Sequence, residues 1–305
     1  MKHITYAIVS IAFFFLMLCF PKETLSGATN GLLLWFQTVL PTLLPFFVLT
    51  NFMIQTNSIF YISRLCGSLL QRLFCVSPAG SFAVLSGLLC GYPIGAKVTA
   101  DLVRAKHISL QEGKYLLSFC NNTSPAFITS FIVLQNFKEE SLLFPTLIIL
   151  YASPVLCSFI FRKFYHISRS NMIQNSVPHT QMNFRFEIFD NCIMNAFENI
   201  TKIGGYIILF SILFSFGEAL PLQYILPSLE ITNGVPYIIK NVPSFELSYI
   251  FILVLASFGG FCSIAQTNST LSGTKLSVFS YTIEKLITAL VTSLFALLYV
   301  LIIHQ

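Results

Sequence analysis

Residues 86–97 interrupt an apolar stretch with residue types that a lipid-facing helix does not favour, and they could bind a charged solute. The candidate site residues of this segment are Gly91, Tyr92, Pro93, Gly95 and Lys97. Glycine relaxes the backbone and proline removes a donor, and backbone freed at membrane depth is tolerated only where protein or a wet cavity satisfies it. A helix that restarts here would present free N–H groups beside the charge of Lys97, which suits a carboxylate or a phosphate. Asp101, four residues on and on the same helical face, could instead neutralise Lys97.

A second break lies in the other half of the chain, at residues 257–266. Its candidate site residues are Gly259, Gly260 and Gln266. Two broken hydrophobic segments in corresponding places of two halves indicate a transporter-like binding site. Aligning Gly91 with Gly260 places Lys97 over Gln266, so the second segment carries a polar residue without a charge at that position.

The segment Cys120–Pro125 places two carboxamides and two hydroxyls inside a predicted span. Its candidate site residues are Asn121, Asn122, Thr123 and Ser124. Polar side chains in hydrocarbon need partners, and Pro125 cannot donate to the carbonyl of Asn121, so the helix is weakened where these side chains gather. The segment predicts binding of a neutral polar ligand or a coupling ion. The alternative is hydrogen bonding between neighbouring helices, worth about 1 kcal/mol per contact.

Composition places the chain in a membrane. It has 305 residues, of which 55% are hydrophobic and 10% charged, with a mean hydropathy of +0.77. A soluble domain carries about 25% charged residues, so we predict an all-α polytopic membrane protein. The net charge of +5 is modest and suggests no nucleic-acid partner. No HExxH, GxSxG, Walker-type or CxxC pattern occurs, so we expect no enzyme, no cofactor and no metal site.

Hydropathy predicts six spanning helices, each long enough to cross a bilayer. They lie near residues 4–20, 31–54, 115–136, 142–161, 203–221 and 285–303, and the first is expected to be an uncleaved anchor rather than a signal peptide. Residues 80–105 and 246–272 contain the two breaks, and we expect each to form a re-entrant hairpin that enters and leaves on one side. Residues 57–77 carry two arginines among apolar positions, which indicates one amphipathic helix lying in the interface.

Two loops differ in composition. Residues 162–186 are polar and short, and are expected to be mobile rather than a domain. Residues 222–245 are rich in proline, which predicts structured coil rather than helix. The second loop contains Glu230, Thr232 and Asn233, followed by a glycine; an Asn-Gly pair is typical of a turn, and these residues alone favour an exposed one.

The positive-inside rule orients this topology. With a cytoplasmic N-terminus, the inner side receives Lys2, Arg64, Arg72, Arg104, Lys106, Lys114, Arg162, Lys163, Arg169, Arg185 and Lys202. The outer side receives only Lys22, Lys138, Lys240 and Lys275. Lys97 and Lys285 stay in the membrane. Glu218 ends a span and Glu284 begins one, and both carboxylates are expected to be interfacial rather than catalytic.

This topology makes the two halves copies of one unit in opposite orientation. Within a single membrane domain, residues 1–305, the halves are residues 31–136 and residues 187–303. Residues 142–186 supply the linking span and the cytoplasmic loop. An inverted-topology repeat with discontinuous helices is an architecture that builds a binding site at the middle of the membrane.

In these segments the chain resembles the YlbJ-type sporulation integral membrane proteins of the Gate (nucleoside recognition) family. The matching segments are Ser-Gly-Leu-Leu-Cys-Gly-Tyr-Pro-Ile-Gly-Ala-Lys at 86–97, Cys-Asn-Asn at 120–122, Glu-Ile-Thr-Asn-Gly at 230–234, Phe-Gly-Gly…Ala-Gln at 258–266 and Leu-Pro-Thr-Leu-Leu-Pro-Phe-Phe-Val-Leu at 40–49. The resemblance implies an endospore-forming bacterium, a role in forming the spore cortex, and kinship with segments of nucleoside transporters and of a ferrous iron transporter. It implies no known substrate. With it, Glu230, Thr232 and Asn233 join the candidate solute-binding residues.

We therefore expect a protein of the bacterial inner membrane, in the mother cell or the forespore, that moves or senses a small polar solute. The lipid bilayer, that solute and a second copy of the chain are its expected partners. The alternative is a non-transporting scaffold that holds a partner of the sporulation machinery. A sealed core without a wet cavity favours the scaffold, whereas a solvent-accessible pocket walled by both broken segments favours transport.

Overall fold

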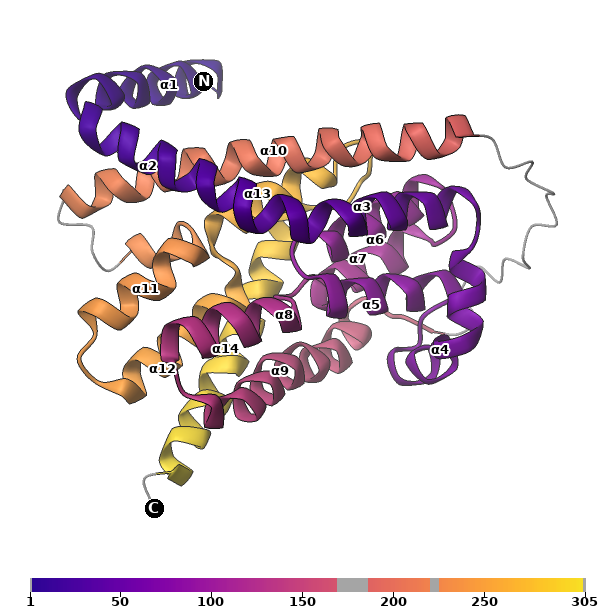
Figure 1. The fold of residues 1–305 in the computed structure, drawn as a ribbon. Coiled ribbons are helices and arrows are strands. Elements are labelled where there is room, and N and C mark those ends of the chain that lie inside the picture. Colours follow the sequence, from indigo (N-terminus) through magenta and orange to yellow (C-terminus); the bar gives the residue numbers. More distant parts are fainter. Residues whose placement is uncertain (1, 169–185, 220–224, 304–305) are drawn as a thin grey trace.

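The computed structural model describes residues 2–168, 186–219 and 225–303, and these residues form helices and connecting segments without a strand (Figure 1). In chain order the elements are α1 (Lys2–Cys19), α2 (Pro21–Leu34), η1 (Trp35–Val39), α3 (Leu40–Gln55), α4 (Ile59–Phe74), α5 (Pro78–Cys90), α6 (Ile94–Arg104), α7 (Leu110–Phe119), α8 (Pro125–Phe127), η2 (Ile128–Phe137), η3 (Glu140–Leu142), α9 (Leu143–Phe164), α10 (Phe186–Ala219), η5 (Leu226–Ser228), α11 (Ile231–Asn241), α12 (Phe245–Phe258), α13 (Gly260–Thr270) and α14 (Val278–Ile303). Most of the polar loop 162–186, with Arg169 and Arg185, lies outside the described residues.

Five helical segments of the described chain are long and apolar enough to cross a membrane. They are Pro21–Gln55, Glu140–Phe164, Phe186–Glu218, Phe245–Thr270 and Val278–Ile302. The pair Gly67–Phe74 and Pro78–Cys90, bent by 97°, is a sixth if it is counted as one span. The prediction of an all-helical, multi-pass membrane protein is thereby confirmed.

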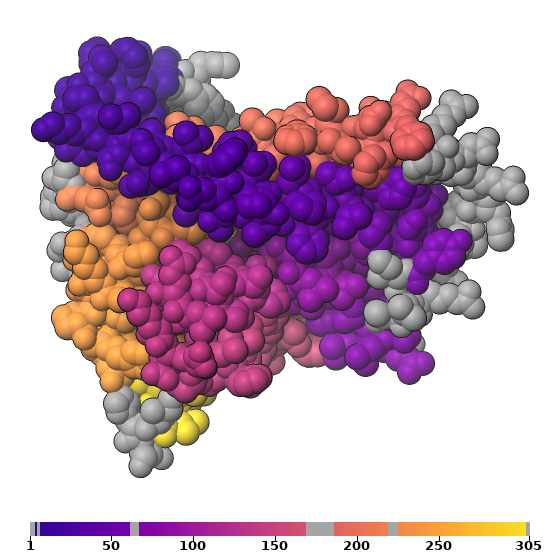
Figure 2. Space-filling view, in the orientation of Figure 1, coloured from indigo at the N-terminus to yellow at the C-terminus, as the bar shows by residue number. Residues whose placement is uncertain are grey.

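The outer surface of the spanning helices is apolar. Phe36 and Leu49 on η1 and α3, and Phe144 and Ile148 on α9, expose their side chains. Figure 2 shows α2 and α3, in indigo to violet, crossing one face of the molecule above the magenta residues of α8 and η2. A continuous apolar surface of this kind suits acyl chains rather than water.

Two predicted spans differ from the structure. The predicted span 4–20 is not among the candidate spans. Within it, the segment Ala7–Cys19 is an apolar helix shorter than those spans. The predicted span 115–136 is interrupted, because α7 ends at Phe119 and α8 begins at Pro125. Pro125 occupies the first turn of α8, and the Ser124 hydroxyl accepts a hydrogen bond from the N–H of Phe127 at 3.2 Å. Proline and an N-cap serine start a new helix here instead of continuing the old one.

Residues 80–105 form the first predicted hairpin, as the antiparallel pair α5 and α6. The turn contains Gly91 at φ +85° and the cis peptide Tyr92–Pro93. A Cβ placed on Gly87 of α5 would lie 3.2 Å from the Cα of Gly95 on α6. Residues equally distant from the turn therefore touch, as they do in two antiparallel helices. Entry and exit of this hairpin on one side of the membrane stays a prediction.

The second predicted hairpin, over residues 246–272, is wrong. α13 follows α12 after the single residue Gly259, and the two count as one candidate span. In Figure 1, α12 lies at the lower left and α13 at the upper centre, on either side of the molecule's middle. Contacts with α14 keep one antiparallel register: Tyr249 with Tyr299, Ser257 with Thr292, and Thr267 with Tyr281 through Asn121. Gly259 and Gly260 both have positive φ, so the backbone is interrupted without reversing its direction.

This correction changes the predicted topology. The Arg104 guanidinium donates to the carbonyls of Thr270 and Ser272, so the end of α13 lies beside the end of α6. Lys275 therefore belongs with the cations at this end, on the side opposite to the one predicted for it. The inverted-topology repeat built on two opposed hairpins is wrong in that form, since α12–α13 crosses once and α14 returns. The end that carries Arg104, Lys106, Arg162 and Lys163 is hereafter the basic end.

Two further segments were predicted from composition. α4 lies where the amphipathic helix was expected, and its position in a membrane interface stays a prediction. Residues 222–245 are not coil throughout, because residues 231–241 form the helix α11. The Glu230 carboxylate caps this helix by accepting from the N–H of Asn233 at 2.9 Å. A carboxylate that satisfies the first-turn N–H groups allows the Asn-Gly pair to be helical instead of forming an exposed turn.

Candidate functional site

The three broken segments meet in the interior of the protein. Gly91 lies against Ser124, because a Cβ on Gly91 would come within 2.8 Å of the Ser124 side chain. Gly95 lies in the same way against Asn121, because a Cβ on Gly95 would come within 3.0 Å of the Asn121 Cα. The ring of Tyr92 covers Gly259, with 2.8 Å to a Cβ placed there. The tip of the α5–α6 hairpin and the break in α12–α13 thus touch beside residues 121–124.

The side chain of Asn121 bonds to three helices, α6, α13 and α14. Its Oδ1 accepts a hydrogen bond from the N–H of Ala96 in the first turn of α6, at 3.2 Å. Its Nδ2 donates to Thr267 Oγ1 on α13 at 3.1 Å and to the hydroxyl of Tyr281 on α14 at 2.8 Å. Asn121 is 1% exposed, so these bonds are made away from water. The Asn121 carboxamide thus supplies hydrogen-bond partners to the N–H of Ala96 at the start of α6 and to the hydroxyls of Thr267 and Tyr281.

The carbonyls that the break in α12 leaves free also find partners from the first half of the chain. The Tyr92 hydroxyl donates to the carbonyl of Ser257 at 2.8 Å, and Thr123 Oγ1 donates to that of Ala256 at 2.6 Å. The last carbonyls of a helix have no partner within it. Side chains of the hairpin tip and of residues 120–124 therefore close the end of α12.

Lys285 is an interior residue. It is 1% exposed, and its Nζ donates to the carbonyl of Asn121 at 3.1 Å and to Oδ1 of Asn122 at 3.2 Å. Its Nζ also lies 5.0 Å from the centre of the Tyr92 ring. Glu284 is 6% exposed and accepts a hydrogen bond from the Tyr165 hydroxyl. The sequence places Glu284 and Lys285 at the start of a span. Their partners lie elsewhere in the chain: Tyr165, just after α9, for Glu284 and the segment 120–124 for Lys285.

The remaining predicted residues have local roles. Glu230 is buried, and its carboxylate accepts from Thr232 and Asn233, so this segment caps α11 rather than lining a cavity. Burial raises the pKa of Glu230, while the hydrogen bonds from its own segment oppose that rise. Gln266 donates to Cys262 Sγ at 3.2 Å one turn earlier on α13. Pro93 precedes the first residue of α6.

A polar pocket of about 510 Å³ opens next to the hairpin, at the basic end. Its walls come from α3, α6, α10 and the end of α13. The lining residues are Asn51, Ile54, Gln55, Lys97, Asp101, Arg104, Ala105, Asn195, Glu198, Asn199, Lys202, Ser269, Thr270 and Ser272. Pockets for small molecules usually measure about 300–1,000 Å³, so this one can hold a small solute.

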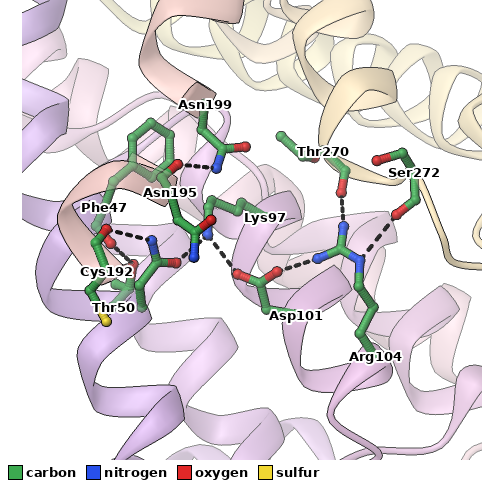
Figure 3. Close-up of polar contacts among 11 residues, drawn as sticks. Phe47, Thr50, Lys97, Asp101, Arg104, Cys192, Asn195, Asn199, Thr270 and Ser272 are labelled. Atoms are coloured by element: carbon green, nitrogen blue, oxygen red, sulfur yellow. Dashed lines mark hydrogen bonds and ion pairs between the residues drawn. The ribbon is translucent and has the colours of Figure 1, made fainter. Parts of the chain in front are cut away.

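A chain of charges runs along the α6 wall of the pocket (Figure 3). The Lys97 ammonium pairs with the Asp101 carboxylate at 2.6 Å, and the same carboxylate accepts from Arg104. The local alternative weighed for Lys97, pairing with Asp101, is therefore formed. Lys97 also donates to Oδ1 of Asn51 on α3 and lies 5.7 Å from the ring centre of Phe47.

The opposite wall carries a second charge pair. On α10, Lys202 pairs with Glu198 at 2.6 Å, and Asn195 and Asn199 line the same wall. The lining contains three cations and two carboxylates, so it has an excess positive charge. Two neutralised carboxylates and several amide groups suit a polar solute that is neutral or negatively charged.

Sequence reasoning missed some residues of this arrangement. Asn51 is a carboxamide inside the apolar span 31–54, and such a residue signals a partner or a function. Its Nδ2 donates to the carbonyl of Cys192 on α10 at 3.4 Å. Arg104 and Lys202 look like ordinary basic residues at helix ends. No pattern in the sequence places α10 opposite α6, so no signal could have paired them.

Comparison with known proteins gives one clear similarity. The sporulation integral membrane protein YlbJ of Bacillus subtilis (strain 168) is 26% identical over 332 aligned residues, which cover 94% of this chain and 81% of that protein. No protein-family model matches the sequence. No solved structure matches the fold. A similarity that runs along nearly the whole chain supports a YlbJ-type protein, the group whose motifs the sequence carries.

Proposed function

We propose that this protein is a transporter-like membrane protein of endospore formation that binds a small polar solute in the pocket between α6 and α10. The name of the YlbJ relative supports the connection with sporulation. The resemblance of the motifs adds a role in the spore cortex and a location in the inner membrane of the mother cell or forespore. The positive-inside rule adds a cytoplasmic N-terminus, with residues 4–20 crossing the membrane.

The pocket is the observation that carries the proposal. It is walled by α6, which is one arm of the hairpin, and by Ser269 and Thr270 at the end of α13. Both broken segments therefore reach it, which is the arrangement expected of a transporter site rather than of a sealed scaffold. α6 lines the pocket through Lys97 and Asp101 and bonds to Asn121 through the N–H of Ala96. A movement of α6 would therefore change both the shape of the pocket and the contact with Asn121.

The excess positive charge of the pocket lining favours a solute with a carboxylate or phosphate group. Nucleosides are also tested, because the motifs resemble those of the Gate family. Purified protein would be screened by thermal shift against inorganic phosphate, small dicarboxylates and nucleosides, since a ligand at 100 times its Kd adds about 2.7 kcal/mol. Lys97→Met should abolish the shift while the protein still accumulates. Lys138→Met changes an exposed lysine outside the pocket and is the matched control.

Asp101 separates binding from packing. If Lys97 only neutralises Asp101, then Lys97→Met with Asp101→Asn should restore heat-resistant spore counts. Neither member of this largely buried pair then carries a charge, and the partly exposed Arg104 keeps its bonds to the carbonyls of Thr270 and Ser272. If Lys97 meets the solute, the double variant should fail like Lys97→Met. Restoration by the double variant, with no thermal shift from any probe class, would count against solute binding at this pocket.

A non-transporting scaffold is the second candidate. The closed packing at the break favours it, because Tyr92, Asn121 and Thr123 are all bonded to protein groups. Scaffold function predicts that pocket variants leave spore formation unchanged, whereas variants at the exposed Lys240 and Asn241 of α11 lower it. Spore counts of the two variant groups distinguish the candidates.

A further inference from the structure

Lys285 differs from the other interior cation in its partners. Lys97 is paired with the Asp101 carboxylate, whereas Nζ of Lys285 donates only to the uncharged oxygens of Asn121 and Asn122. Among the described residues, the ion pairs are Lys97–Asp101, Arg104–Asp101 and Lys202–Glu198. The adjacent carboxylate, Glu284, is bonded to Tyr165 instead. Lys285 is thus a buried cation without a neighbouring anion.

Burying an unpaired ammonium costs several kcal/mol unless oriented dipoles replace water. Lys285 lies just past the end of α7, where the negative end of that helix's dipole favours a cation. The free carbonyl of Asn121 and the carboxamide of Asn122 point their oxygens at Nζ. The π face of Tyr92 covers a third side at 5.0 Å.

This oxygen set has a known use at membrane depth. Where a spanning helix is interrupted, unwound backbone carbonyls and the C-terminal ends of half-helices coordinate monovalent cations. The segment Cys120–Ser124 likewise leaves backbone carbonyls outside a helix, between the end of α7 and the start of α8. Here an ammonium group of the chain itself takes the position that a free cation would occupy.

We propose that Lys285 is a tethered cation that fills a monovalent-cation site formed by Asn121 and Asn122 in the interrupted helix. In its protonated form the ammonium balances the helix end, so the wild-type protein needs no Na⁺ or K⁺ at this place. The proposal rests on contacts in the interior and is independent of the solute pocket.

Removing the tether should open the site to an ion. Lys285→Ala takes away the ammonium and its stem but leaves both oxygens. Thermal unfolding in detergent would be measured while NaCl or KCl replaces N-methylglucamine chloride at constant ionic strength, which holds screening fixed. Lys285→Ala should show a saturable rise in Tm of at least about 2 °C with one of the two ions. The wild type should show none.

Two controls make the test specific. Lys285→Met fills the vacated volume without a charge, so it should not respond to either ion. Adding Asn122→Leu to Lys285→Ala removes one oxygen and should abolish the response. Equal responses of wild type, Lys285→Ala and Lys285→Met would overturn the proposal.

Failure to fold is also informative. Lys285→Ser is the second variant, because its hydroxyl adds an oxygen to the vacated space. The potassium of the cell would fill the site in both variants, so the proposal requires that at least one accumulates in the membrane. Absence of both Lys285→Ala and Lys285→Ser from membranes that contain the wild type would overturn it.

Discussion

The Oδ1 atom of Asn121 accepts a hydrogen bond from the backbone N–H of Ala96 at 3.2 Å, across a separation of 25 residues. This bond fixes the first turn of α6 on the interrupted helix. The same carboxamide reaches α13 and α14 through Nδ2. One buried side chain thus joins the α5–α6 hairpin to the helices α13 and α14.

Asn121→Ala should therefore destabilise the protein more than loss of one bond would. It leaves the N–H of Ala96 without a partner and removes the donor to two hydroxyls, a cost of about 2–4 kcal/mol. Asn136→Ala is the matched control, since the Asn136 carboxamide makes a single bond to the carbonyl of Phe131. Denaturation in detergent measures both, and equal losses would contradict the central role of Asn121.

The glycine contact between the hairpin and the break predicts a second result. A Cβ on Gly87 would lie 1.6 Å from the carbonyl oxygen of Cys120, so Gly87→Ala must shift backbone. The expected loss is about 1–3 kcal/mol or more. Gly205→Ala on α10 meets no atom within 4 Å and should be neutral or stabilising by up to about 1 kcal/mol. A neutral Gly87→Ala would show that the hairpin does not pack this closely.

The single crossing of α12–α13 can be tested by labelling. Cysteines placed at positions 106 and 275, in a background without reactive native cysteines, should both react from the same side of the membrane. A cysteine at position 138 should react from the other side, because Phe137 packs beside Tyr249 at the far end of α12. Reaction of positions 106 and 275 from opposite sides would restore the re-entrant hairpin.

Glu112 predicts a pH dependence of stability. Burial raises the pKa of Glu112 above its ordinary 4.5, and the hydrogen bonds from Ser77 only partly oppose this. The folded protein then binds this proton more tightly than the unfolded chain, so the contribution of Glu112 to stability is greatest below pH 4.5 and is lost as pH rises through the raised pKa. Glu112→Gln keeps an acceptor for the Ser77 N–H and cannot ionise.

Tm of the Gln variant should therefore fall less than that of the wild type between about pH 5 and pH 8. The exposed Glu187→Gln is the matched control and should follow the wild type. Parallel curves for all three proteins would show that Glu112 does not govern this dependence.

Local sequence signals predicted the helix breaks well. Gly91, Pro93 and Pro125 each act on their own backbone, and so their effect is visible without tertiary structure. The break at Gly259 was also found, but not its geometry. A glycine permits either a reversal or a continuation, and the packing of α12–α13 against α14 decides between them.

The candidate site was predictable only in part. Lys97 and Asp101 form a pair because four residues separate them on one helix, which the sequence shows directly. The opposite wall depends on α10 packing against α3, and no local pattern encodes that contact. The partners of Lys285 were not predictable for the same reason: Asn121 and Asn122 lie more than 160 residues earlier.

The long separation between these partners has a consequence for biosynthesis. Tyr281 follows Asn121 by 160 residues, and Lys285 comes later still, so the ribosome delivers the interrupted helix to the membrane well before its partners. Until α14 emerges, Asn121 and Asn122 lack the hydroxyl and the ammonium that they bond in the finished protein. The last helix therefore completes the assembly, and a nascent chain halted before it would expose unsatisfied polar groups to the machinery that degrades misfolded membrane proteins.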